Sequence, residues 1–254
     1  MENCVYRLSQ VKAHRVDRVS TGCNPLDMMF GKTEYNGSTT YGIPRGKVIL
    51  ISGSKGAGKS RLCLGMAGCM SNSGEQVLFF EGEVAKEEFK EWARPFSINE
   101  NNCYVSESND IEDEMAQTKE VKPSIVIVDS LNMIKGIRQP TEVIKIMESY
   151  KNIAKDMNIA VILIGFLSKD GSTKGNNDIE YLVDVVCHVK PISKKAIPVN
   201  KLSQYKGVFY IEIPDKNRVG ETGNWVCFKH EKGDIKLVSS SFINGIYSNT
   251  GNRQ

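Results

Sequence analysis

The sequence predicts an α/β domain with a mainly parallel central sheet, flanked by helices and extended by antiparallel strands toward the C-terminus. Between residues 47 and 165, short apolar segments alternate with amphipathic ones, which is typical of a parallel sheet covered on both faces. After residue 182, segments with strand character follow one another closely with turn signals between them. A chain of 254 residues is long enough to bury the core that such a domain needs.

The first 45 residues are mixed and polar. Residues 31–42 are rich in Gly, Thr, Tyr and Asn, which predicts an exposed loop. We therefore divide the chain into an N-terminal segment with a variable loop (1–45), a core (46–238) and a weakly ordered C-terminal tail (239–254).

Within the core, each element follows from the spacing of its apolar residues. Buried strands are predicted at 47–52 (KVILIS), 76–80 (QVLFF), 124–128 (SIVIV) and 159–165 (IAVILIG), with a short strand at 103–105. Helical spacing predicts helices at 60–70, 86–96 and 141–157. The segments 182–189, 207–213, 225–229 and 234–238 also have strand character, and we expect antiparallel additions to the sheet edge there.

Bulk composition excludes several classes of protein. No apolar stretch approaches the roughly 18 to 20 residues that span a bilayer. No apolar run follows a basic N-terminus, so we expect a cytoplasmic protein with no membrane segment. The seven cysteines form no C-x-x-C pair, so we expect no zinc element. Their number is odd and several lie in apolar runs, which predicts buried free thiols in a reducing compartment. The net charge of +3 permits an anionic partner without requiring one.

The strongest functional signal is the segment 53–60 (GSKGAGKS), which matches G-x-x-x-x-G-K-[ST] between a predicted strand and a predicted helix. Its glycines let the backbone turn tightly and direct N–H groups at phosphate oxygens, and the helix start adds a positive dipole end. Lys59 is expected to reach the β- and γ-phosphates, and the Ser60 hydroxyl to ligate Mg²⁺. We therefore predict that Mg-ATP binds to Gly53, Ser54, Lys55, Gly56, Ala57, Gly58, Lys59, Ser60 and Arg61.

Acidic residues follow two of the predicted strands. Asp129 ends the strand 124–128, and the carboxyl ends of parallel strands carry the chemistry of such sheets, so we expect Asp129 to be the second partner of Mg²⁺. Hydrolysis also needs a group that orients or deprotonates water. Glu81 and Glu83 both follow the strand 76–80, and spacing does not choose between them.

Several of these segments, taken in order, resemble the ATPase core of the bacterial RadA (Sms) DNA-repair proteins within the RecA/DnaB superfamily. The resemblance runs from about residue 8 to about residue 238. It is carried by RVSTG at 18–22 with Leu26-Asp27, the phosphate loop, VLFFEGE at 77–83, IVIVDS at 125–130, SKDG at 168–171 and KNRVG at 216–220. The last is similar to the family's KNRFG and is the most discriminating. The resemblance implies a RecA-like P-loop NTPase fold with Glu83, not Glu81, as the catalytic glutamate.

The resemblance also implies an assembly and a polymer partner. ATP would lie between the subunits of a homo-oligomer, a hexameric ring or a filament. Lys216 and Arg218, by spacing alone a basic turn between strands, would neutralise charge at the neighbour's γ-phosphate. Single-stranded DNA would be held through its backbone by two loops, 131–140 with Lys135 and Arg138, and 166–178 with Lys169 and Lys174. The expected function is an ATP-dependent motor or mediator in DNA recombination, repair or replication, including helicase or translocase activity.

The sequence departs from the RadA pattern at identifiable places. We expect neither the family's four-cysteine zinc element nor its Lon-protease-like domain in this chain, and Phe166 stands where the family has a histidine. Two alternatives stay open. One is a KaiC-like regulatory ATPase, and the other is a nucleotide-binding scaffold with little turnover.

Overall fold

The computed structural model describes residues 7–11, 15–136, 140–165, 177–192, 207–231 and 234–237. It confirms the predicted α/β class, with one nine-stranded sheet in the order β13-β12-β11-β10-β5-β9-β8-β6-β7. In chain order these strands are β5 (Lys47–Ser52), β6 (Val77–Glu81), β7 (Cys103–Ser106), β8 (Ile125–Asp129), β9 (Ala160–Ile164), β10 (Val185–Pro191), β11 (Val208–Ile213), β12 (Asn224–Glu231) and β13 (Asp234–Leu237).

The six strands from β10 to β7 are parallel, and β11, β12 and β13 extend the sheet in antiparallel fashion. One prediction is corrected here. We expected the segment 182–189 among the antiparallel additions, but β10 pairs parallel with β5, with Val185 opposite Ile49. The reason is α6 (Asn177–Leu182), a helix not foreseen from the sequence, which lies in the connection from β9 and returns the chain in the same direction.

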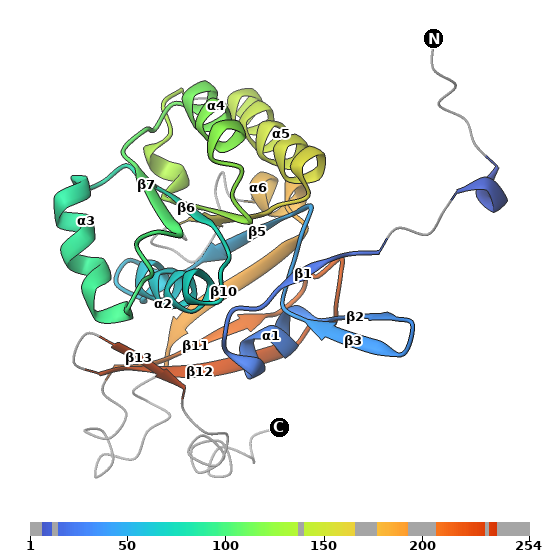
Figure 1. Ribbon diagram of the computed structural model, residues 1–254, viewed down its shortest axis with the longest axis horizontal. Helices are drawn as coiled ribbons and strands as arrows, with labels where there is room; N and C mark the ends of the chain where they lie inside the picture. The colour runs from blue at the N-terminus through green and yellow to red at the C-terminus, as the bar shows by residue number, and fades with distance from the viewer. Residues whose placement is uncertain are drawn as a thin grey trace.

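Helices cover both faces of the sheet (Figure 1). On one face lie α2 (Lys59–Asn72) and α3 (Lys86–Ala93), above a core that includes Ile49, Leu62 and Phe79. On the other lie α4 (Ile111–Val121), α5 (Pro140–Met157) and α6, whose core includes Leu50, Met147 and Tyr150. The predicted helix 86–96 ends early at Ala93 and continues as the 3₁₀ turn Arg94–Phe96, because Pro95 has no N–H for a further helical bond.

The helix α4 was not predicted because its sequence, IEDEMAQTKEV, is mostly polar. Its start is defined by Asp110, whose carboxylate accepts hydrogen bonds from the N–H groups of Glu112 and Asp113. Its fully buried side chains are the polar residues Glu114 and Thr118, while its apolar residues Ile111, Met115 and Val121 pack against the core but are only partly buried. Three apolar positions among charged and polar neighbours give a weak periodic signal.

Residues 31–42 were predicted to be an exposed loop and instead form a hairpin, β2 (Lys32–Tyr35) and β3 (Ser38–Tyr41). Asn36 and Gly37 connect the strands with φ of 49° and 76°. Asn-Gly between β-prone residues favours this two-residue turn, and that signal was not used in the prediction. The strands are largely exposed, as expected of this segment.

The N-terminal region packs onto the same core as the sheet. Its elements are β1 (Arg18–Val19), α1 (Asn24–Phe30) and β4 (Ile43–Pro44), and their side chains Val19, Leu26, Phe30 and Ile43 are almost fully buried. The division of the chain at residue 45 stays a prediction, and the predicted tail 239–254 lies outside the described residues.

Within the described ranges, no helix combines the length and apolar character needed to cross a bilayer. The six cysteines found there are free thiols, but the prediction that they are buried holds for Cys63, Cys187 and Cys227 and not for Cys23, Cys69 and Cys103.

Candidate active site

The phosphate-loop segment connects β5 to α2 at the carboxyl end of β5, which lies between β9 and β10. Ser54, Lys55 and Gly56 form the exposed tip, Ala57 is buried, and Arg61 is exposed in the first turn of α2. Gly58 immediately precedes α2 with a φ of 97°, and no side chain caps the helix there. The first N–H groups of α2 are thus unopposed by a side-chain cap, as an anion site at a helix start requires.

Lys59 lies within this loop. Its ammonium donates hydrogen bonds to the carbonyls of Gly53 (3.0 Å) and Ser54 (3.1 Å), so the side chain folds back across the loop. Burial lowers the pKa of Lys59, and the nearby charge of Asp129 acts in the opposite direction. Lys59 therefore lies inside the predicted phosphate-binding region, within electrostatic range of the acidic end of β8.

Asp129 ends β8 and is 6% exposed. Burial raises the pKa of its carboxyl group, and a hydrogen bond with the Ser60 side chain lowers it. The fold thus brings together the two residues predicted to hold Mg²⁺, although 69 positions separate them in the chain (129 − 60). A carboxylate and a hydroxyl are oxygen ligands of the kind that Mg²⁺ prefers, so the residues present fit this ion.

The structure distinguishes the two glutamates that spacing left open. Glu81 ends β6 opposite Asp129 and is 3% exposed, and burial raises the pKa of its carboxyl group to about 7. Its Oε1 accepts a hydrogen bond of 2.8 Å from the backbone N–H of Glu83. Glu83 is exposed, and its Oε1 lies 3.4 Å from the Ser130 hydroxyl. Glu81 therefore holds the turn, while Glu83 is the carboxylate that solvent can reach.

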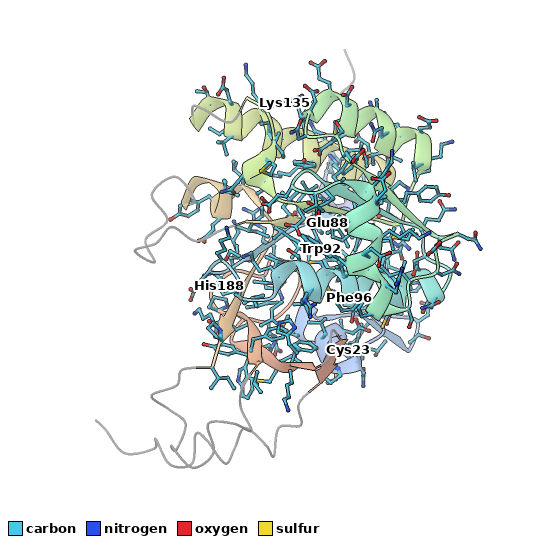
Figure 2. All side chains as sticks on the ribbon, turned by 90° about the vertical axis from the view of Figure 1, so that its left-hand side faces the viewer. Cys23, Glu88, Trp92, Phe96, Lys135 and His188 are labelled. Carbon is cyan, nitrogen blue, oxygen red and sulfur yellow. The ribbon has the colours of Figure 1, made fainter. Side chains whose placement is uncertain are left out.

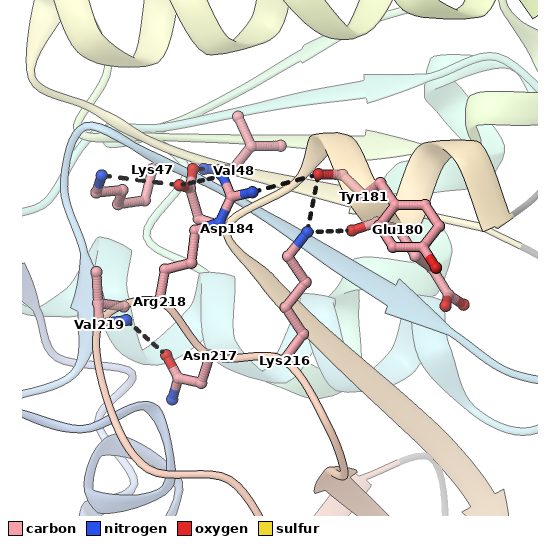
Figure 3. A network of polar contacts seen from close by, with 9 residues as sticks. All are labelled: Lys47, Val48, Glu180, Tyr181, Asp184, Lys216, Asn217, Arg218 and Val219. Carbon is pink, nitrogen blue, oxygen red and sulfur yellow. Dashed lines mark hydrogen bonds and ion pairs between the residues drawn. The ribbon is translucent and has the colours of Figure 1, made fainter.

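Lys216 and Arg218 belong to a polar network around the end of α6 (Figure 3). The Lys216 ammonium donates to the carbonyls of Glu180 (2.6 Å) and Tyr181 (2.9 Å), where the helix dipole favours a cation. The Arg218 guanidinium lies 3.7 Å from Asp184, whose carboxylate also accepts a 3.1 Å hydrogen bond from the N–H of Val48.

This network lies at the opposite end of β5 from the phosphate loop, too far away to contact that loop in the same chain. Asp184 is bound to Lys47 and Val48 at the amino end of β5, whereas the phosphate loop follows Ser52 at its carboxyl end. Five strand steps at roughly 3.3 Å each separate the two ends by about 16 Å, more than a lysine or arginine side chain spans. Within one subunit, the structure therefore does not bring Lys216 and Arg218 to the phosphate loop.

Of the four predicted DNA contacts, the described residues include only Lys135. It is exposed and follows the 3₁₀ turn Leu131–Met133 after β8. In Figure 2 it lies at the top of the molecule, beside helices. Its backbone N–H donates to the carbonyl of Asn109 (2.8 Å), which anchors the segment. Arg138, Lys169 and Lys174 lie outside the described residues, as does Phe166.

Two contacts between distant parts of the chain were not foreseen. The Arg18 guanidinium donates to the carbonyls of Gly42 (2.8 Å) and Val219 (2.7 Å), which joins the RVSTG segment to the KNRVG turn. A Cβ added to Gly58 would lie 2.4 Å from Nε2 of His230, so β12 also reaches the phosphate loop. The Arg18–Val219 and Gly58–His230 contacts join residues about 170 to 200 positions apart, and no periodicity in the sequence predicts them.

The chain is similar to known proteins in sequence and in fold. The family described as "RecA N-terminal domain" matches residues 2–162. The chain is 29% identical over 229 residues to "DNA repair protein RadA" of Mycolicibacterium smegmatis, covering 86% of this chain and 45% of the relative. It is 30% identical over 243 residues to the protein of that name from Mycobacterium tuberculosis H37Rv, covering 92% and 46%. The chain thus spans about half the length of the curated relatives it matches.

Among solved structures, one described as an "ATPase Domain" superimposes with a TM-score of 0.68 at 19% identity, covering 88% of this chain and 92% of that one. At this identity the likeness concerns the fold. Together with the family match, it confirms the predicted RecA-like architecture.

Proposed function

This chain belongs to the RecA family, and from that premise we propose that it is a Mg²⁺-dependent ATPase that acts on DNA in recombination or repair. The observation that carries the proposal is the meeting of Lys59, Ser60, Asp129 and Glu83 at the carboxyl edge of the parallel strands. These lysine, hydroxyl and carboxylate side chains are of the kinds that enzymes of phosphoryl transfer use. RadA relatives, named as DNA repair proteins, support the choice of DNA as the partner.

In this proposal each residue has a distinct task. The backbone of the loop 53–60 and Lys59 bind the triphosphate, while Ser60 and Asp129 would hold Mg²⁺. Bound there, the ion would neutralise charge on the β- and γ-phosphates. Glu83 orients and deprotonates the attacking water, and Glu81 fixes the turn that presents it.

A direct test is the steady-state rate of ATP hydrolysis with and without a single-stranded oligonucleotide. We expect DNA to stimulate hydrolysis by the unmodified chain, and Lys59→Ala to abolish it. Lys119→Ala is the matched control, because this exposed lysine of α4 lies on the opposite face of the sheet from α2. Hydrolysis that DNA does not affect would favour a KaiC-like regulatory ATPase, and tight ATP binding without turnover would favour a scaffold. Absence of nucleotide binding would refute the proposal.

We further propose that the active site is completed by a second copy of the chain, in a ring. Lys216 and Arg218 are too far from their own phosphate loop to act there, but a neighbouring subunit would allow them to reach another. They would then neutralise charge on the transferred phosphoryl group. Lys216 must first leave the carbonyls of Glu180 and Tyr181.

Mixing two inactive variants tests this shared site. Lys59→Ala removes the nucleotide-binding side of an interface, and Lys216→Ala removes the neighbour's contribution. If the site is shared, some mixed interfaces contain both intact halves, and hydrolysis recovers on mixing. A mixture that stays as inactive as its components, while native mass measurements show mixed oligomers, would contradict the shared site.

For the DNA contact we propose Lys135 together with Arg138, Lys169 and Lys174, and for the assembled ring we propose translocase or helicase activity. Contacts of lysine and arginine to phosphates make affinity fall steeply with salt. Fluorescence anisotropy of a labelled oligonucleotide should therefore show weaker binding by Lys135→Ala and a smaller slope against salt concentration. An unchanged slope would remove Lys135 from the DNA surface.

A further inference from the structure

A histidine from the C-terminal part of the chain lies against the phosphate loop. His230 is near the end of β12, and a Cβ at Gly58 would lie 2.4 Å from its Nε2 and 2.9 Å from its Cε1. The ring edge that carries Nε2 therefore faces the backbone at the start of α2.

Several contacts hold the imidazole ring in this orientation. It stacks on Phe209 of β11 with ring centroids 4.5 Å apart and planes at 22°. The backbone N–H of His230 donates to the carbonyl of Gly207 (2.8 Å), and His230 alternates along β12 so that it shares a face with Val226 and Phe228. These two residues belong to the core beneath α2, so the strand directs His230 toward the same helix.

The surroundings favour the neutral form of His230. Burial lowers the pKa of its imidazole, and the positive charge of Arg61 in α2 lowers it further. Nδ1 is buried and has no hydrogen-bond partner among the described residues. A proton on Nδ1 would be an unpaired buried donor, which costs more than leaving Nε2 protonated toward the loop. The tautomer inferred from these contacts thus presents an N–H group to the phosphate loop.

We propose that His230 is part of the nucleotide site, and that its Nε2–H donates a hydrogen bond to a phosphate oxygen bound at the start of α2. The proposal deepens the proposed function and rests on it. A neutral donor suits this position because it adds a hydrogen bond to a charged acceptor, which is stronger than one to a neutral acceptor. The alternative is that the ring only fills space between Phe209 and Gly58, in which case its N–H has no part in binding.

Three variants separate these possibilities. His230→Phe keeps an aromatic ring on Phe209 but has no N–H donor, and His230→Gln restores an N–H donor. His188→Phe is the control, because His188 alternates with Cys187 and Val189 along β10 and therefore lies on the opposite face of the sheet (labelled in Figure 2). Thermal melting without nucleotide shows whether each variant folds as the unmodified chain does.

The measurement is a fluorescence titration with a labelled Mg-ADP, followed by competition with unlabelled ATP and with inorganic pyrophosphate. We expect His230→Phe to bind all three about tenfold more weakly, the loss of one hydrogen bond to a charged group. His230→Gln should recover most of that loss, and His188→Phe should bind as the unmodified chain does.

Two outcomes would overturn the proposal. Unchanged affinity of a folded His230→Phe variant would mean that the ring only packs. If His230→Phe binds the nucleotides more weakly but keeps the affinity of the unmodified chain for pyrophosphate, the contact lies away from the phosphates. If the unmodified chain binds no nucleotide, the proposed function itself is wrong, and the role proposed for His230 is refuted as well. That result differs from the other two because it appears before any variant is made.

Discussion

The roles assigned to Glu81 and Glu83 lead to opposite expectations for two chemically similar substitutions. Glu83→Gln removes the carboxylate that is exposed to solvent beside Ser130. General base catalysis contributes about 100- to 10,000-fold, so we expect kcat to fall by that factor. Affinity for ATP should hardly change, because Glu83 is not expected to touch the nucleotide before reaction.

Glu81 acts through the backbone, and its substitutions should be graded. Its Oε1 accepts a 2.8 Å hydrogen bond from the N–H of Glu83, and the side chain is 3% exposed. Glu81→Gln keeps an oxygen that can accept this bond, so the turn should survive and kcat should stay within about threefold. Glu81→Ala removes the acceptor of this partly buried N–H, at a cost of up to about 1 to 3 kcal/mol. If this cost displaces Glu83 from the position that catalysis requires, kcat falls by about tenfold or more.

Single-turnover hydrolysis with saturating ATP, alongside a separate measurement of ATP affinity, distinguishes these effects. The expected order of rates is unmodified, then Glu81→Gln, then Glu81→Ala, with Glu83→Gln slowest. A Glu81→Gln variant as inactive as Glu83→Gln would show that Glu81 takes part in the chemistry, and the reasoning from burial would be wrong. Normal rates in Glu83→Gln would refute the assignment of the base.

Two predictions concern stability. Burial raises the pKa of Glu114 to about 7, so the folded state holds this proton more tightly than the unfolded state does. The stability that the protonated carboxyl group contributes is therefore present at low pH and is lost as pH rises through 7. Glu114→Gln, which can still pair with Tyr150, should lose less stability between pH 5 and pH 8 in urea unfolding, by up to about 3 kcal/mol; an unchanged pH dependence would contradict this. Within α2, a Cβ at Gly68 would lie 2.3 Å from the backbone oxygen of Phe96, whereas one at Gly65 would be 3.8 Å from its nearest neighbour. Gly68→Ala should therefore lower the free energy of unfolding by about 1 to 3 kcal/mol, while Gly65→Ala should raise it by up to about 1 kcal/mol; equal effects of the two would count against the packing argument.

Local sequence patterns were sufficient for the parts of the fold that depend on neighbouring residues. The apolar segments KVILIS, QVLFF and SIVIV predicted β5, β6 and β8 to within about two residues, because strands buried on both faces are continuously apolar. Elements with little apolar periodicity were missed. These are α4, whose buried side chains are polar, the short helices α1 and α6, and the hairpin that its Asn-Gly turn could have revealed.

By itself, the sequence determined that a phosphate-binding loop follows a buried strand and that acidic residues follow two others, because those signals lie within a few residues of one another. Only the tertiary structure decided which glutamate is exposed, since that depends on the hydrogen bond from Glu83 to the carboxylate of Glu81. It also placed Lys216 and Arg218 at the amino end of β5 and His230 against Gly58. Strand order and register create these contacts between distant parts of the chain, and no local periodicity encodes them.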